Sequence, residues 1–93
     1  MKLKQLDNLR KQIDTIDESI VSLLAKRMKI VQKIGIIKKR NHIPSLDQNR
    51  WNQVLETLQK SAKRKHIPSE TITRIWNIIH EYALRLESTN TEG

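Results

Sequence analysis

The chain of 93 residues is long enough for one domain with a modest core and too short for two. Only 3% of the residues are aromatic and 30% are charged, so one copy alone would bury a thin aliphatic core. The formal net charge of +8 favours an anionic partner, and the lack of cysteine excludes disulfides and thiolate metal sites.

Two prolines, Pro44 and Pro68, divide the chain into three segments. Apolar residues recur with the 3.6-residue period of a helix in each segment, and none keeps the alternation of a strand. The sequence therefore predicts an all-α fold of one domain, residues 1–87, followed by a tail at 88–93 that we expect to be disordered. The three helices are expected at about residues 4–40, 47–64 and 68–87.

The first predicted helix carries an apolar seam with coiled-coil spacing over about five heptads. Its members are Leu6, Leu9, Ile13, Ile16, Ile20, Leu23, Ile30, Ile34 and Ile37. A helix over residues 4–40 would be about 55 Å long, whereas a compact domain of this size has a diameter of about 32 Å. One end must project, so we expect a homodimer in which the partner chain covers the seam.

Arg27 stands at a seam position where an apolar residue is expected. A guanidinium there indicates a structural ion pair, a side chain that reaches solvent, or a bound anion. Lys38 follows within about 20° on the helix surface and about 16 Å along its axis, so the two could hold opposite ends of one small anion. Arg10 lies about 25 Å from Arg27, so it could join such a site only from a second chain.

The second predicted helix begins with groups that suit a polar ligand. We expect Asp47 to be its N-cap, with Leu46 and Trp51 packed across the cap as a hydrophobic staple. Arg50 lies in the first turn, close to backbone amides that attract anions. The third helix begins at Pro68 or the next residue, because proline is favoured in a first turn.

Other classes of site receive little support from the sequence. His42, His66 and His80 are too scattered to form a metal site and are interpreted as loop and surface histidines, so we expect neither metal nor cofactor. The basic runs at residues 38–40 and 63–65 are interpreted as solvated helix ends, and we expect no nucleic-acid partner. No apolar run is long enough for an export signal or a membrane span, so we expect a cytoplasmic protein that does not contact membranes.

Four spaced motifs occur together over about residues 3–87. They are Leu9-Arg10-x-x-Ile13-Asp14-x-Ile16-Asp17, Leu23-Leu24-Ala25-x-Arg27-Met28, Ile34-Gly35-x-x-Lys38 and Asp47-x-x-Arg50. As a set they resemble the all-helical chorismate mutases. The resemblance implies an intertwined homodimer of three-helix chains that rearranges chorismate to prephenate, an isomerase step of the shikimate pathway in aromatic amino acid biosynthesis, without a cofactor.

The resemblance also implies roles for single residues. Arg27 and an Arg10 supplied by the other subunit would bind the two carboxylates of a small dicarboxylate substrate. Lys38 would contact a carboxylate and the ether oxygen, and Arg50 would add positive field. Asp47 would help to hold the ring hydroxyl.

Three substrate-contacting positions depart from the usual pattern of the family. Trp51 replaces a polar or acidic residue that contacts the ring hydroxyl, and Ala83 replaces a small hydroxyl residue. Glu87 stands where a glutamine often donates to the ether oxygen. Because an ionised glutamate cannot donate, we hypothesise that Glu87 acts in its protonated form, and the alternative is that it frays into solvent at the helix end.

Three other functions stay open at this point. An isochorismate pyruvate-lyase resembles the same scaffold and uses a similar cationic pocket. The charge of +8 also allows a basic helical nucleic-acid binder. The departures at Trp51, Ala83 and Glu87 allow a dimerisation module without activity.

Overall fold

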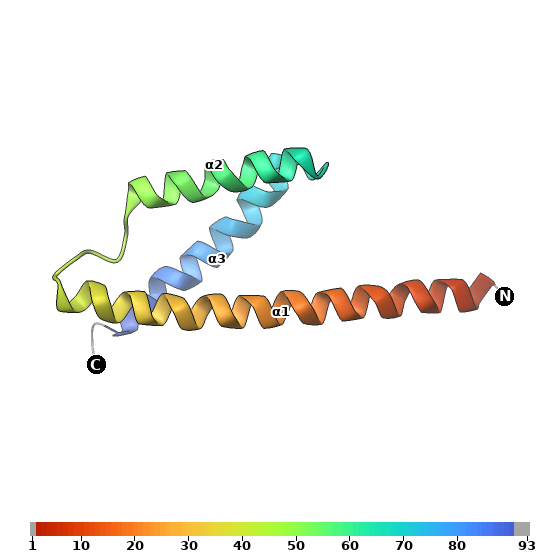
Figure 1. Ribbon diagram of the computed structural model, residues 1–93, viewed down its shortest axis with the longest axis horizontal. Coiled ribbons are helices and arrows are strands. Elements are labelled where there is room, and N and C mark those ends of the chain that lie inside the picture. The colour runs from red at the N-terminus through yellow and green to blue at the C-terminus, as the bar shows by residue number, and fades with distance from the viewer. Residues whose placement is uncertain (1, 91–93) are drawn as a thin grey trace. The chain divides into compact units, whose positions relative to one another are not determined.

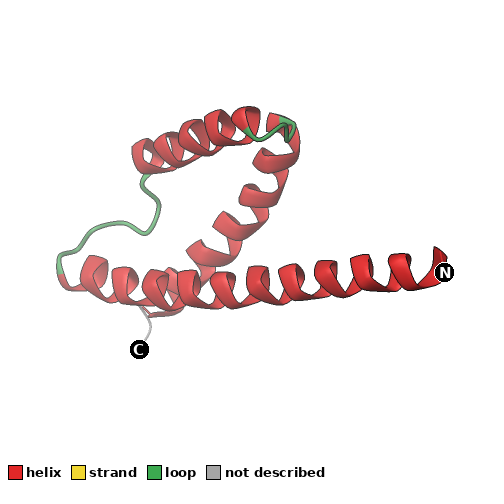
Figure 2. Ribbon diagram, turned by 45° about the vertical axis from the view of Figure 1, so that its right-hand side comes forward, coloured by secondary structure: helices red, strands yellow, loops and turns green. Residues whose placement is uncertain are grey.

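The computed structural model describes residues 2–90 and contains three α-helices, with no strand in that part of the chain (Figures 1 and 2). The predicted all-α fold with three helices is therefore confirmed. The helices are α1 (Lys2–Arg40), α2 (Gln48–Arg64) and α3 (Ser69–Asn90). The chain forms two compact units, Met1–Ile30 and Val31–Gly93, which are described separately.

In the first unit, α1 carries the predicted apolar seam as an exposed stripe. The exposed fraction of its members in this unit runs from 42% at Leu6 to 62% at Leu23. Exposed apolar surface of this extent is typical of a face that another chain covers. The seam is thus placed as predicted, on one helix that continues without a break to Arg40.

The second unit has a thin core, as the composition led us to expect. Its buried residues within the described chain include three small or medium apolar ones, Val31, Ala62 and Ala83, and one charged one, Glu87. Helix α2 packs against α3, and the two are also joined by a hydrogen bond in which the Gln59 amide donates to the Thr73 hydroxyl at 2.8 Å. A charged group in so small a core directs attention to Glu87.

Helices α1 and α2 end in the same way, at a His-Ile-Pro sequence that occurs at residues 42–44 and again at 66–68. His42 and His66 have left-handed backbones, with φ of 55° and 61°. In each case the amide of the following isoleucine donates to the carbonyl five residues earlier at 2.8 Å, which is the Schellman motif. The proline then prevents the helix from continuing.

The third helix ends later than predicted. Helix α3 continues to Asn90, so residues 88–90 are helical where the sequence analysis expected a tail. Residues 91–93 lie outside the described part of the chain. Glu87 is only 7% exposed and pairs with Lys38, so the helix is still held by a contact at the point where it was expected to fray.

Candidate active site

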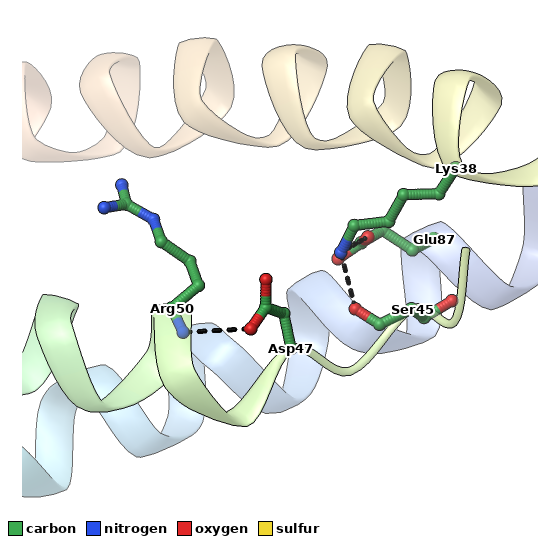
Figure 3. A network of polar contacts seen from close by, with 5 residues as sticks. All are labelled: Lys38, Ser45, Asp47, Arg50 and Glu87. Carbon is green, nitrogen blue, oxygen red and sulfur yellow. Dashed lines mark hydrogen bonds and ion pairs between the residues drawn. The ribbon is translucent and has the colours of Figure 1, made fainter. Parts of the chain in front are cut away.

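Lys38 and Glu87 form the centre of the candidate site. Lys38 lies near the end of α1, and its ammonium is 2.8 Å from Oε1 of Glu87 on α3. The same ammonium donates to the backbone carbonyl of Ser45, in the loop before α2, at 2.6 Å. Figure 3 shows the lysine reaching toward both acceptors. The side chains are 19% and 9% exposed, so the ion pair is largely shielded from water.

This arrangement fixes the lysine charge in space. An ammonium group has three donor hydrogens. One of them goes to the Ser45 carbonyl, and the Glu87 carboxylate forms an ion pair with the same group. A further donor direction therefore remains for an oxygen atom of a ligand. Because a buried carboxylate is costly without a partner, Lys38 and Glu87 also stabilise each other's burial. The structure thus brings into direct contact two residues that the sequence predicted as catalytic.

Asp47 and Arg50 stand at the beginning of α2. The predicted N-cap is confirmed, since the backbone of Asp47 is extended (φ −119°, ψ 97°) and its Oδ1 atom accepts from the Arg50 amide at 3.0 Å. Capping occupies one carboxylate oxygen and leaves the other in a position to meet a ligand. The Arg50 guanidinium extends from the same first turn, on the stretch of chain that follows the Lys38-bound loop (Figure 3).

Trp51 has a partner that the sequence analysis did not identify. Its indole stacks on the ring of His80, with centroids 3.8 Å apart and planes inclined by 8°. His80 was interpreted as a surface histidine, yet it is half-buried on α3. Helical spacing contained a signal, because His80 lies seven residues before Glu87 and therefore on the same helix face. Ala83, also predicted in the site, lies between them and is 5% exposed.

Arg10 and Arg27 lie on α1 within the first unit. Arg10 is exposed, whereas Arg27 is half-buried and its Nη1 atom is buried. The other six predicted site residues, which lie on all three helices and at the N-cap of α2, belong to the second unit. They are Lys38, Asp47, Arg50, Trp51, Ala83 and Glu87.

Within residues 2–90, no group of three or more histidine, cysteine, aspartate or glutamate side chains is arranged to hold a metal ion. Across the same residues, none of the helices is both long and apolar enough to cross a membrane. The candidate site is accordingly built from cations, carboxylates and one aromatic stack.

Comparison with known proteins gives a consistent family. Residues 9–88 match the family model of chorismate mutase type II. The chain is 33% identical to the bifunctional chorismate mutase/prephenate dehydratase of Aquifex aeolicus over 91% of its own length and 24% of that protein, and 34% identical to that of Escherichia coli K12 over 78% and 19%. It is 27% identical to the chorismate mutase of Methanocaldococcus jannaschii over 97% and 91%. The chain thus spans a quarter or less of the bifunctional relatives.

Proposed function

Since the chain belongs to the chorismate mutase type II family, we propose that it catalyses the unimolecular rearrangement of chorismate to prephenate. The observation that carries the proposal is the shielded Lys38 ammonium, fixed between Glu87 and the Ser45 carbonyl inside the matched residues. A preorganised cation of this kind stabilises negative charge that develops on an oxygen atom in the transition state. It does so without rearranging when the reaction occurs.

The proposed reaction requires no covalent bond between the protein and the substrate. One carbon–oxygen bond breaks and one carbon–carbon bond forms within a single substrate molecule, so neither nucleophile nor cofactor takes part. The site selects a compact conformer of the substrate and stabilises charge on the breaking ether bond. A cationic site on a chain of net charge +8 suits a substrate with two carboxylates.

In the proposed site, each cation has a separate task. Arg27 and Arg10 of the partner subunit bind the two carboxylates and so fix both ends of the substrate. Lys38 contacts a carboxylate and the ether oxygen, and Arg50 adds positive field. The Asp47 oxygen that does not cap α2 accepts from the ring hydroxyl.

Glu87 meets the ether oxygen as a donor in this proposal, and that role requires its protonated form. In the unliganded protein Glu87 forms an ion pair with Lys38. A protonated carboxyl can keep its carbonyl oxygen beside the Lys38 ammonium while its O–H group donates to the ether oxygen, so the proposed role leaves Lys38 in place.

The proposal includes a homodimer in a reducing cytoplasm. The exposed seam on the first unit supports the dimer, because it presents long apolar side chains at coiled-coil spacing to solvent. The lack of cysteine supports the compartment. A dimer of this kind also gives Arg10 a way to reach the site of the partner subunit.

Isochorismate pyruvate-lyase activity is the second candidate, and the Trp51–His80 stack favours keeping it. The stack places aromatic surface at a position where the resemblance implies a polar contact to the ring hydroxyl. A site without that contact depends less on where the hydroxyl of the substrate is attached.

Direct assays separate the two activities. The purified protein is incubated first with chorismate and then with isochorismate, and prephenate and salicylate are measured. We expect prephenate from chorismate, and a loss of at least about 10²-fold in Lys38→Ala. A folded protein that forms salicylate but no prephenate would establish the lyase instead. If it forms neither product, the mutase proposal is wrong.

A further inference from the structure

Trp51 on α2 stacks on His80 on α3, and none of the substrate contacts proposed above accounts for this stack. The two rings are nearly parallel, at 3.8 Å and 8°, and both side chains are half-buried. Flat rings in contact over their faces resist tilting, whereas aliphatic side chains can slide and adopt new rotamers. The contact is therefore suited to fixing the position of one helix relative to the other.

The stack joins the two stretches of chain that carry the polar groups of the site. On α2, the Trp51 amide donates to the Asp47 carbonyl at 3.0 Å, and the preceding Arg50 amide donates to the Asp47 carboxylate. On α3, His80 and Glu87 lie on one face, about 10 Å apart along the helix. Any shift of Trp51 relative to His80 thus moves Asp47 and Arg50 relative to Glu87.

A second contact between the same helices lies away from the site. The hydrogen bond from Gln59 to Thr73 occurs eight residues after Trp51 and seven residues before His80. Both contacts fit one antiparallel register, and they are separated by about 10–12 Å along the helices. The pair Gln59–Thr73 therefore serves as a control, because its loss removes a contact between the same two helices at a point remote from the site.

We propose that His80, through its stack with Trp51, is a positioning residue of the active site: it fixes the first turn of α2, with Asp47 and Arg50, against the face of α3 that carries Glu87. The inference rests on the proposed mutase activity. His80 acts by setting where the groups of the α2 turn meet the substrate.

Three variants at His80 distinguish the effect of a flat aromatic ring from the effect of side-chain volume alone. His80→Phe keeps a ring for Trp51 to stack on, His80→Leu keeps apolar volume without the ring, and His80→Ala removes both. We expect His80→Phe to retain kcat/KM within about threefold, and the other two to lose about 10- to 100-fold, mainly in kcat, as for a small misplacement of catalytic groups. The control Thr73→Val removes the remote hydrogen bond and should retain kcat/KM within about twofold.

A double variant tests whether the two rings act together. Trp51→Leu alone should lose about as much activity as His80→Leu, whereas in the His80→Ala background it should cause little further loss, because the stack is already gone. All variants are assayed well below their melting temperatures, with circular dichroism to confirm the fold. A purely structural contact would lower the stability and leave kcat unchanged.

The outcomes that overturn the inference differ from those that overturn the function. If the wild type rearranges chorismate and His80→Leu is equally active, or if Thr73→Val loses as much activity as His80→Leu, His80 does not position the site. If the wild type has no activity, the mutase proposal fails and amide hydrogen exchange decides the positioning. The amides of Arg50 and Trp51 should then exchange faster in His80→Leu than in the wild type, and unchanged exchange overturns the inference.

Discussion

Replacing Glu87 by glutamine separates two effects of its carboxylate, one on stability and one on catalysis. The side chain is 9% exposed and its Oε1 atom lies 2.8 Å from the Lys38 ammonium. Glutamine has the same shape and keeps a hydrogen bond to the ammonium, but it loses the charge-assisted part of the contact. We therefore expect the free energy of unfolding of Glu87→Gln to fall by about 1–3 kcal/mol, as measured by urea titration.

The effect of the same change on activity should have the opposite sign. An ionised carboxylate only accepts hydrogen bonds, whereas the glutamine amide donates at every pH. If the protonated form of Glu87 is the donor to the ether oxygen, glutamine should replace it without an added proton. Wherever Glu87 is ionised, the variant should then exceed the wild type by up to about 10²-fold, which is the usual worth of one such donor.

The measurement is kcat/KM with chorismate from about pH 5 to about pH 9, for the wild type, Glu87→Gln and Glu81→Gln. Glu81 is an exposed carboxylate on the same helix, so its replacement controls for the loss of one negative charge. The pH profile of kcat/KM for Glu81→Gln should match that of the wild type. A wild-type profile that stays flat from acid to alkali would refute the donor role. A Glu87→Gln variant that is less active at every pH would show that the carboxylate acts by placing Lys38.

Three further predictions concern Lys38, the arginines and a helix end. Lys38→Ala should lower kcat by at least about 10²-fold, measured with chorismate. Arg10→Ala and Arg27→Ala should each be inactive. Their equal mixture should regain roughly a quarter of the wild-type activity, because half of the dimers are hybrids and each hybrid has one complete site of two. A mixture that stays inactive after verified subunit exchange contradicts a shared site. His66→Gly should raise the free energy of unfolding by about 1 kcal/mol in denaturant at fixed protein concentration, since glycine adopts the left-handed backbone without strain.

The parts of the fold that the sequence predicted are those that depend on local chemistry. The seam spacing and the breaks before Pro44 and Pro68 determine where α1 and α2 end, because a proline ring is incompatible with a continuing helix. The Asp47 cap was equally predictable, since its carboxylate reaches an amide only three residues away. Such signals need no knowledge of the other helices.

Contacts between helices were harder to predict. The ion pair of Lys38 with Glu87 joins the end of α1 to α3, and the stack of Trp51 on His80 joins α2 to α3. Both join residues far apart in the sequence, so they depend on how the helices pack. The family resemblance implied roles toward a substrate for both Lys38 and Glu87, but periodicity alone contains no information on which side chains meet. Trp51 was assigned to a local staple because its distant partner could not be seen.

The left-handed histidines show a further limit of local rules. Glycine is the usual residue at the position after a helix end, and neither His42 nor His66 was expected there. The Schellman hydrogen bonds and the proline that follows stabilise a backbone that histidine alone disfavours by about 1–2 kcal/mol. The pattern His-Ile-Pro at both ends therefore indicates a shared turn, which is recognisable only after one instance has been described.

The position of Glu87 links the stability of the second unit to its chemistry. The core of this unit is thin, and a charged residue is among its few buried side chains. Burial of Glu87 without Lys38 would be costly, so the lysine that we propose for catalysis is also needed for packing. A glutamine in this place would always offer a donor for the ether oxygen but would hold α1 and α3 together less strongly, because its contact with Lys38 would lose the charge-assisted part. In our proposal the glutamate therefore favours a firmly held Lys38 over a permanent donor.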